Sequence, residues 1–221
     1  LTTIAKALAN NEFTFYYQPI VSLITGKICG AESLIRWIQP DGRVIPPSLF
    51  IPLAEETGFI TEITQELIPR SVHDLISAQA VDRALWFSIN VSAKDFLMAN
   101  FASIVEAALA NRISSPDKLR IEITESSFLP LDAITKKTLF DIADLGVPIM
   151  LDDFSAGHTT LSNLNRLPFT MIKLSMEIVQ RSIETRDDFR LLRHLISMGH
   201  QLRLEMIAEG VETLEIGRAH V

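Results

Sequence analysis

The 221-residue sequence has little cysteine, no long hydrophobic run and no excess of positive charge. Its single cysteine, Cys29, excludes an intrachain disulfide and is typical of a protein from a reducing compartment. No apolar run approaches the roughly 18 residues that a membrane-spanning helix needs. The formal net charge of −7 argues against a nucleic-acid duplex or an anionic membrane as the main partner. A small phosphorylated ligand stays open, because a bound metal ion can invert the local field.

Two kinds of motif are also missing. The few histidines do not form a Cys/His set, which argues against a structural zinc site. No glycine-rich dinucleotide fingerprint follows the first apolar run, which argues against an open doubly wound sheet. Hydrophobic residues make up 48% of the chain and charged residues 21%. This balance indicates a folded domain with a sizeable core.

Short apolar or β-branched runs alternate with stretches whose hydrophobic residues recur every three or four positions. This alternation predicts parallel β-α units, and the number of runs favours a β/α barrel over an open sheet. The seven strand candidates are FTFYYQPI, KICGAESLIRW, ALWFSINVS, KLRIEITES, VPIMLDD, FTMIKLS and LRLEMIAEG. The main helix candidates are residues 60–80, 96–111, 134–145 and 176–198.

Acidic and amide residues recur where these strands end. In a β/α barrel the active site lies at the C-terminal ends of the strands. The residues found there are Glu32, Arg36, Asn90, Glu122, Glu125, Asp152, Asp153, Lys173 and Glu209. Oxygen-rich clusters suit hard divalent cations such as Mg²⁺ or Mn²⁺. Two adjacent aspartates repel each other unless something offsets their charge, and a pair of shared cations, a recurrent device for displacement at phosphorus, would do so.

Each of these residues also has an ordinary structural role open to it. Asp153 could cap the following helix, and Glu125 could be a first-turn acid. Lys173 could be a surface lysine, and Asn90 could serve a turn. The barrel rule favours one common site because six strand ends carry such residues together.

In the order and spacing of its motifs, the sequence resembles the EAL domain, the bacterial cyclic di-GMP phosphodiesterase family. The resemblance runs from about residue 11 to residue 213, and the tripeptide that names the family stands here as Glu32-Ser33-Leu34. The matching motifs are YYQPIVSLITGKICGAESLIRW, PPSLFIPLAEETGFI, FSINVSAKDF, RIEITES, LDDFSAG, LPFTMIKLS and IAEGVET.

The resemblance implies a TIM-like β/α barrel whose first strand runs antiparallel to the others. Because the chain stops before the last strand of the family, we expect a C-terminally truncated barrel. Residues 1–214 are expected to form this EAL domain fragment, and residues 215–221 to be a non-native tail. The fragment is expected to be less stable than its parent protein, and its activity stays an open question.

The resemblance also implies hydrolysis of cyclic di-GMP to linear 5′-pGpG with two Mg²⁺ or Mn²⁺ ions. It assigns one ion to Glu32, Asn90, Glu122 and Asp152, and the second to Asp152, Asp153 and Glu209. In the resemblance Lys173 contacts the attacking water, and either Lys173 or a carboxylate such as Glu209 takes its proton. Glu125 braces the loop that carries Asp153. The substrate contacts that it implies are Gln18, Leu34 and Arg36, with Arg36 near a phosphate.

One departure from the family leaves a second function open. Ser155-Ala156-Gly157 replaces the usual Gly-Thr-Gly, so the placement of Asp153 is less secure. The alternative is a catalytically degenerate EAL domain that acts as a cyclic di-GMP receptor or a protein-interaction module. An unrelated metal-dependent barrel lyase or aldolase would have to produce the whole motif series by chance.

The resemblance sets further expectations for the setting of the domain. It is compatible with a homodimer and with an upstream sensory or diguanylate-cyclase domain in the parent protein. Cytoplasmic exposure is expected because the nucleotide is intracellular, and membrane anchoring of the parent protein is compatible with this.

Overall fold

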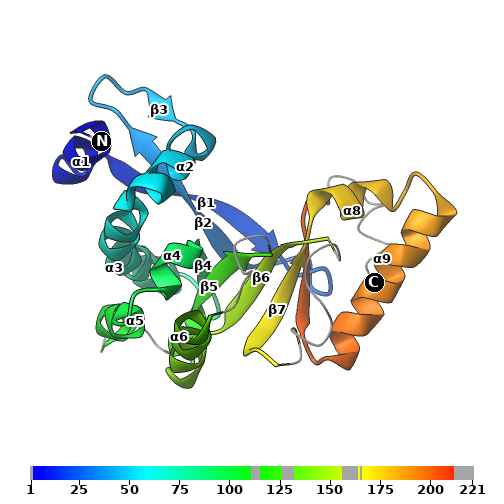
Figure 1. The fold of residues 1–221 in the computed structure, drawn as a ribbon. Coiled ribbons are helices and arrows are strands. Elements are labelled where there is room, and N and C mark those ends of the chain that lie inside the picture. The colour runs from blue at the N-terminus through cyan, green and yellow to red at the C-terminus, as the bar shows by residue number, and fades with distance from the viewer. Residues whose placement is uncertain (1, 111–114, 126–131, 156–163, 165, 212–221) are drawn as a thin grey trace.

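The computed structural model of the chain describes residues 2–110, 115–125, 132–155, 164 and 166–211. The tail expected to be non-native, residues 215–221, lies outside these residues, as do Ala156 and Gly157. The described residues form an eight-stranded mixed sheet that curls into part of a barrel, with helices on its outer side (Figure 1).

All seven strand candidates form strands. They are β1 (Phe13–Val21), β2 (Ile28–Ile38), β4 (Trp86–Asn90), β5 (Leu119–Thr124), β6 (Ile149–Phe154), β7 (Phe169–Leu174) and β8 (Glu205–Ala208). Their order in the sheet is β1-β2-β4-β5-β6-β7-β8, and a short β3 (Val44–Ile45) pairs with β2. β1 is antiparallel to β2, and the later neighbours on this path are parallel. The predicted barrel architecture with an antiparallel first strand is therefore confirmed.

Two stretches that were each predicted as one continuous helix are each divided into two helices. The stretch 96–111 is divided between α4 (Ala93–Phe96) and α5 (Phe101–Leu109), because Asn100 leaves the helical conformation with φ −106° and ψ 7°. The stretch 176–198 is divided between α8 (Met176–Arg181) and α9 (Arg186–Gln201). Thr185 is extended and its side chain accepts a hydrogen bond from the backbone N of Asp188. A side-chain cap such as that of Thr185 competes with helix continuation and is invisible to hydrophobic periodicity.

The other helices begin and end close to their expected positions or lie outside the predicted set. α3 (Phe59–Gln79) and α6 (Ala133–Asp144) correspond to the predicted stretches 60–80 and 134–145. α1 (Thr2–Ala9), α2 (Pro47–Thr57) and the short 3₁₀ helix η1 (Pro116–Lys118) complete the described helices. None of the described helices combines the length and the hydrophobicity that crossing a membrane requires.

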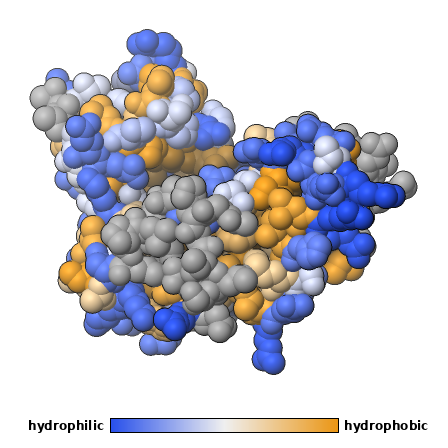
Figure 2. Space-filling model, turned by 45° about the vertical axis from the view of Figure 1, so that its right-hand side comes forward, coloured by the Kyte–Doolittle hydropathy of each residue, from blue (hydrophilic) through white to orange (hydrophobic). Residues whose placement is uncertain are grey.

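The main hydrophobic core lies between the outer face of the sheet and the helices. On β5, Leu119, Ile121 and Ile123 belong to this core, so alternation turns the intervening residues, Arg120 and Glu122, to the inner face. In the α8–α9 lobe, buried residues of α9 join the core, while the outer surface of the lobe is mostly hydrophilic (Figure 2). The fold thus brings charged residues of several strands inside the barrel.

Inside the barrel, an apolar layer of side chains lies nearer the N-terminal ends of the parallel strands than the polar layer does. Trp86, Met150 and Met171 form a cluster on β4, β6 and β7. Gly30 on β2 leaves room for this layer, because a Cβ there would lie 2.4 Å from Trp86 Cδ2. Two residues further along β6 and β7, Asp152 and Lys173 begin the polar layer nearer the C-terminal ends of the strands.

Candidate active site

Lys173 lies at the centre of a buried cluster of carboxylates. Its side chain is 2% exposed. Its Nζ lies 2.7 Å from Glu122 Oε2, 2.8 Å from Glu209 Oε1, 3.0 Å from Glu32 Oε2 and 3.0 Å from Asp152 Oδ1. The four carboxylates come from β2, β5, β6 and the residue that follows β8. The structure thus brings together residues that are up to 177 positions apart, from Glu32 to Glu209.

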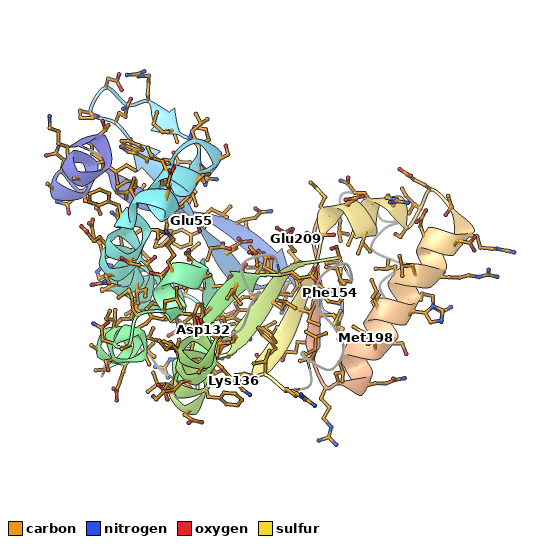
Figure 3. The ribbon with its side chains drawn as sticks, in the orientation of Figure 1. Glu55, Asp132, Lys136, Phe154, Met198 and Glu209 are labelled. Atoms are coloured by element: carbon orange, nitrogen blue, oxygen red, sulfur yellow. The ribbon has the colours of Figure 1, made fainter. Side chains whose placement is uncertain are left out.

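Glu209 reaches the cluster because the backbone continues the sheet past β8. Its backbone N donates a hydrogen bond to the carbonyl of Leu174, at 3.2 Å. In Figure 3, Glu209 lies at the edge of the sheet where β6 also ends, close to Phe154. This is the C-terminal edge of the parallel strands, where a β/α barrel is expected to carry its site.

Asp152 and Asp153 lie on the same side despite being adjacent. In a regular strand, neighbouring side chains point to opposite faces. Asp153 instead has φ 53°, in the left-handed region, and the pairing of β6 with β7 shifts register between Leu151 and Phe154. This irregularity returns the side chain of Asp153 towards that of Asp152. One ligand oxygen from each of Asp152, Asp153 and Glu209 lies within 4.8 Å of the others.

A second group of oxygens lies beside the first. Ligand atoms of Glu32, Glu122 and Asp152 also lie within 4.8 Å of one another. Asn90, paired in register with Glu122 across β4 and β5, donates from Nδ2 to Glu32 Oε1 at 2.7 Å. Asp152 belongs to both groups, so the two groups adjoin.

Burial and mutual repulsion shape the electrostatics of this centre. Burial raises the pKa of Glu122 to about 7, against the lowering effect of Lys173. Burial likewise raises the pKa of Asp152 to about 6, again opposed by Lys173. For Lys173, burial by itself lowers the pKa, but the surrounding carboxylates, Glu122 and Asp152 first, raise it above its ordinary value. A single ammonium group faces several carboxylates, so the centre attracts further cations.

The residues present fit a hard divalent cation. Glu122 Oε1 is buried and has no hydrogen-bond partner within the described part of the chain. A buried carboxylate oxygen without a partner is costly, and a cation would satisfy it. The candidate donors are carboxylate oxygens together with the amide of Asn90, the donor chemistry that Mg²⁺ and Mn²⁺ prefer.

Glu125 connects the residues on either side of Asp153. Its backbone N donates to the carbonyl of Asp152 at 3.0 Å. Its Oε2 accepts hydrogen bonds from the backbone N of Ser155 at 3.1 Å and from Ser155 Oγ at 3.3 Å. Glu125 is 2% exposed. The serine that departs from the family pattern therefore adds a hydroxyl contact to the loop, which the sequence did not indicate.

The predicted substrate residues lie on the face of the β1–β2 hairpin that carries Glu32. Gln18 pairs directly with Glu32, and Leu34 lies two residues further along β2. Arg36 lies further still. Its Nη1 donates to the carbonyl of Ile35 at 2.8 Å, and its guanidinium lies 5.2 Å from the ring centroid of Tyr16. Sequence reasoning missed Tyr16, although its spacing of two from Gln18 was the available signal.

A pocket of about 250 Å³ adjoins the centre at Leu34 and Asn90. It runs between the sheet and helices α2 and α3, and its walls are mostly apolar. Glu55, labelled on α2 in Figure 3, lines it together with Ser92, and Ser92 Oγ donates to Glu55 Oε1 at 2.8 Å. Sequence reasoning did not single out Glu55 or Ser92, because their proximity depends on how α2 packs.

These observations define the class of protein. It is a β/α-barrel protein whose first strand is antiparallel and whose oxygen-rich acidic centre, at the C-terminal edge of the sheet, is a candidate divalent-metal site. The family model of the EAL domain matches residues 2–219. The chain therefore belongs to the EAL domain family.

Known proteins similar to this chain include cyclic di-GMP enzymes. The signaling protein YkoW of Bacillus subtilis is 34% identical over 207 residues, 94% of this chain and 26% of YkoW. The cyclic di-GMP phosphodiesterase PdeL of Escherichia coli is 31% identical over 214 residues, 96% of this chain and 59% of PdeL. The solved structure of the PaMucR phosphodiesterase in complex with c-di-GMP has a TM-score of 0.88 at 28% identity, covering 99% of this chain and 89% of that one. The chain thus spans only part of the length of these curated relatives.

Proposed function

We propose that this domain is a phosphodiesterase that hydrolyses cyclic di-GMP to linear 5′-pGpG with two divalent cations, Mg²⁺ or Mn²⁺. The observation that carries the proposal is the pair of oxygen groups that share Asp152. Glu32 and Glu122 complete one group, and Asp153 and Glu209 complete the other. A carboxylate shared between adjoining cation sites is suited to in-line displacement at phosphorus.

The chemistry follows from the charges of the two reactants. A phosphodiester resists hydrolysis because its anionic oxygens repel nucleophiles. When bound, the cations neutralise that charge and lower the pKa of a bound water. The protein residues hold the partners of the reaction in place: Lys173 directs N–H donors into the centre, and Asn90 orients Glu32 through its amide.

The acceptor of the proton must lie within hydrogen-bond reach of the attacking water, which enters the centre from solvent. Of the four carboxylates around Lys173, Glu209 has the most exposed side chain, at 30%, whereas Glu122 is fully buried. We therefore assign Glu209 as the proton acceptor and Lys173 as the group that orients the water. Gln18, Leu34 and Arg36 lie along one face of the hairpin and would hold the rest of the substrate.

The relatives support the choice of substrate. PdeL is named a cyclic di-GMP phosphodiesterase, and the PaMucR structure is a complex with c-di-GMP. Each covers almost all of this chain. Because this chain spans 59% of PdeL, a homodimer, an upstream sensory or diguanylate-cyclase module and a cytoplasmic location of the domain stay predictions for the whole protein.

The test is hydrolysis of cyclic di-GMP by the purified chain with Mg²⁺ or Mn²⁺, with pGpG detected by chromatography. We expect turnover by the wild-type chain and a loss of about 100-fold or more in Glu32→Gln, because this change removes one carboxylate oxygen of the first group. Glu106→Gln is the matched control, since Glu106 is exposed on α5. Near-normal turnover by Glu32→Gln at saturating Mg²⁺ would contradict the proposed site.

The second candidate function is a receptor that binds cyclic di-GMP without cleaving it. The replacement of Gly-Thr-Gly by Ser155-Ala156-Gly157 after the paired aspartates favours it. Calorimetry separates the two functions: tight binding of cyclic di-GMP with no pGpG formed in the presence of either cation would establish the receptor.

A further inference from the structure

We propose that Tyr16 is a specificity-determining residue that stacks on a purine base of the cyclic dinucleotide. This inference rests on the proposed function, because it requires that the phosphodiester lies at the acidic centre. The acidic centre binds the phosphate, and the role proposed for Tyr16 is to recognise the base.

The strand register places Tyr16 on the correct face. Tyr16 is directly opposite Leu34, as Gln18 is directly opposite Glu32. Residues directly opposite each other in an antiparallel pair project from the same face of the sheet. Tyr16 therefore shares a face with Glu32, and it is displaced from Gln18 by two residues, roughly 7 Å along β1.

The exposure of Tyr16 distinguishes it from its neighbour. Tyr17 projects from the opposite face, where its ring lies 4.7 Å from that of Phe87 and its hydroxyl donates to Asp74 Oδ2 at 2.5 Å. These contacts account for Tyr17 as part of the packing against α3. Tyr16 is 50% exposed, although it is a large aromatic residue on the face that carries the acidic centre.

Arg36 orients the ring of Tyr16. Its guanidinium carbon lies 5.2 Å from the ring centroid, within the range of a cation–π contact. Arg36 Nη1 is also held by the carbonyl of Ile35 at 2.8 Å. The remaining N–H groups of Arg36 can donate to a phosphate oxygen, so Tyr16 and Arg36 together offer a ring for a base and a cation for the backbone.

The chemistry of the ligand matches this arrangement. Aromatic side chains bind nucleobases by stacking, and the larger π-face of a purine gives the greater overlap. With one phosphodiester at the acidic centre, the adjoining nucleoside extends along the face of the hairpin. Tyr16 is exposed there and its ring contacts Arg36, whose guanidinium has the donor geometry to bind a phosphate.

The experiment compares Tyr16→Ala, Tyr16→Phe and the control Phe140→Ala in the hydrolysis of cyclic di-GMP. We expect KM to rise about tenfold in Tyr16→Ala, while kcat changes by less than about twofold, because stacking contributes to binding in the ground state and the transition state alike. Tyr16→Phe keeps the ring and should restore KM to within about threefold of the wild type. Phe140 is also partly exposed, at 40%, but it lies on α6 in the outer layer, so its removal should leave KM unchanged.

The Mn²⁺ concentration for half-maximal activity supplies a readout that separates base recognition from damage to the acidic centre. It should be the same in the wild type and in Tyr16→Ala. An unchanged KM in Tyr16→Ala would overturn the stacking role and leave the proposed phosphodiesterase intact. An equal rise of KM in Tyr16→Phe would also overturn it, because the hydroxyl would then be responsible.

The same variants separate failure of this inference from failure of the proposed function. If the wild-type chain binds cyclic di-GMP without cleaving it, the proposed hydrolysis fails. Stacking is then judged by the same tenfold difference in Kd, measured by calorimetry. If the wild-type chain, shown to be folded by circular dichroism, neither binds nor cleaves cyclic di-GMP, both proposals are overturned.

Discussion

Asp95 places a buried carboxylate next to the segment that carries Asn90. It is completely buried, and its Oδ2 accepts hydrogen bonds from the backbone N of Ser92 at 3.0 Å and from Thr64 Oγ1 at 3.1 Å. Its Oδ1 is buried without a hydrogen-bond partner among the described residues. Burial raises the pKa of Asp95 to about 7, although both hydrogen bonds lower it.

The raised pKa of Asp95 makes the free energy of unfolding depend on pH, and the direction of that dependence can be worked out. An unfolded aspartate titrates near pH 3.9, so between about pH 4 and pH 7 the folded state holds a proton that the unfolded state has released. Stability therefore falls as the pH rises through this window, and the loss is complete above the pKa of the folded state. Three pH units at roughly 1.4 kcal/mol per unit amount to about 4 kcal/mol, of which about 3 kcal/mol falls between pH 5 and pH 8.

The variant Asp95→Asn tests this reasoning because it stays neutral throughout and can keep the two hydrogen bonds to Ser92 and Thr64 through its amide oxygen. Urea unfolding of the wild type and the variant at pH 5, 6, 7 and 8 gives the difference in their free energies of unfolding. We expect that difference to shift in favour of Asp95→Asn by about 3 kcal/mol from pH 5 to pH 8. Groups common to both proteins cancel. A difference that does not vary with pH would refute the buried, protonated state of Asp95.

Two further predictions concern the acidic centre and its loop. Added Mn²⁺ should raise the Tm of the EDTA-treated wild type by several degrees, because about 100-fold excess over Kd stabilises the folded state by about 2.7 kcal/mol. The rise should be absent in Asp152→Asn, since Asp152 belongs to both oxygen groups, and an equal rise in both proteins by scanning fluorimetry would contradict the site. Ser155→Ala removes the hydroxyl contact to Glu125 and should raise the Mn²⁺ concentration for half-maximal hydrolysis by about fivefold, with Ser155→Thr retaining the wild-type value. Identical Mn²⁺ titrations of wild type and Ser155→Ala would show that this contact does not position Asp153.

The strands were predictable because their signals are local. Runs such as VPIMLDD combine β-branched and apolar residues with a boundary of turn residues, and each run became a strand. The helix interruptions were not predictable from periodicity, because Asn100 and Thr185 end the helical conformation within otherwise continuous hydrophobic patterns. At Thr185 the competing effect is the hydrogen bond that its side chain accepts from the backbone N of Asp188, whereas the side chain of Asn100 makes no such cap bond.

The residues of the candidate site, and Asp95 beside it, divide in the same way. Glu32, Glu122 and Lys173 could be found because strand ends in a barrel converge on one edge. Tyr16 offered only its spacing of two from Gln18 as a signal, and Asp95 offered none, because what distinguishes each residue is a contact with a distant part of the chain. For Tyr16 that contact is with Arg36 across the hairpin, and for Asp95 it is with Thr64 of α3.

The sequence by itself determined the alternation of strands and helices, and hence the kind of barrel and the row of acidic residues at its C-terminal edge. Only the tertiary structure decided that Asp152 and Asp153 face the same side, since this depends on a left-handed residue and a register shift against β7. It also decided that one buried lysine sits among four carboxylates. Periodicity specifies which face a side chain takes, whereas distances between side chains depend on how the strands are paired and curled.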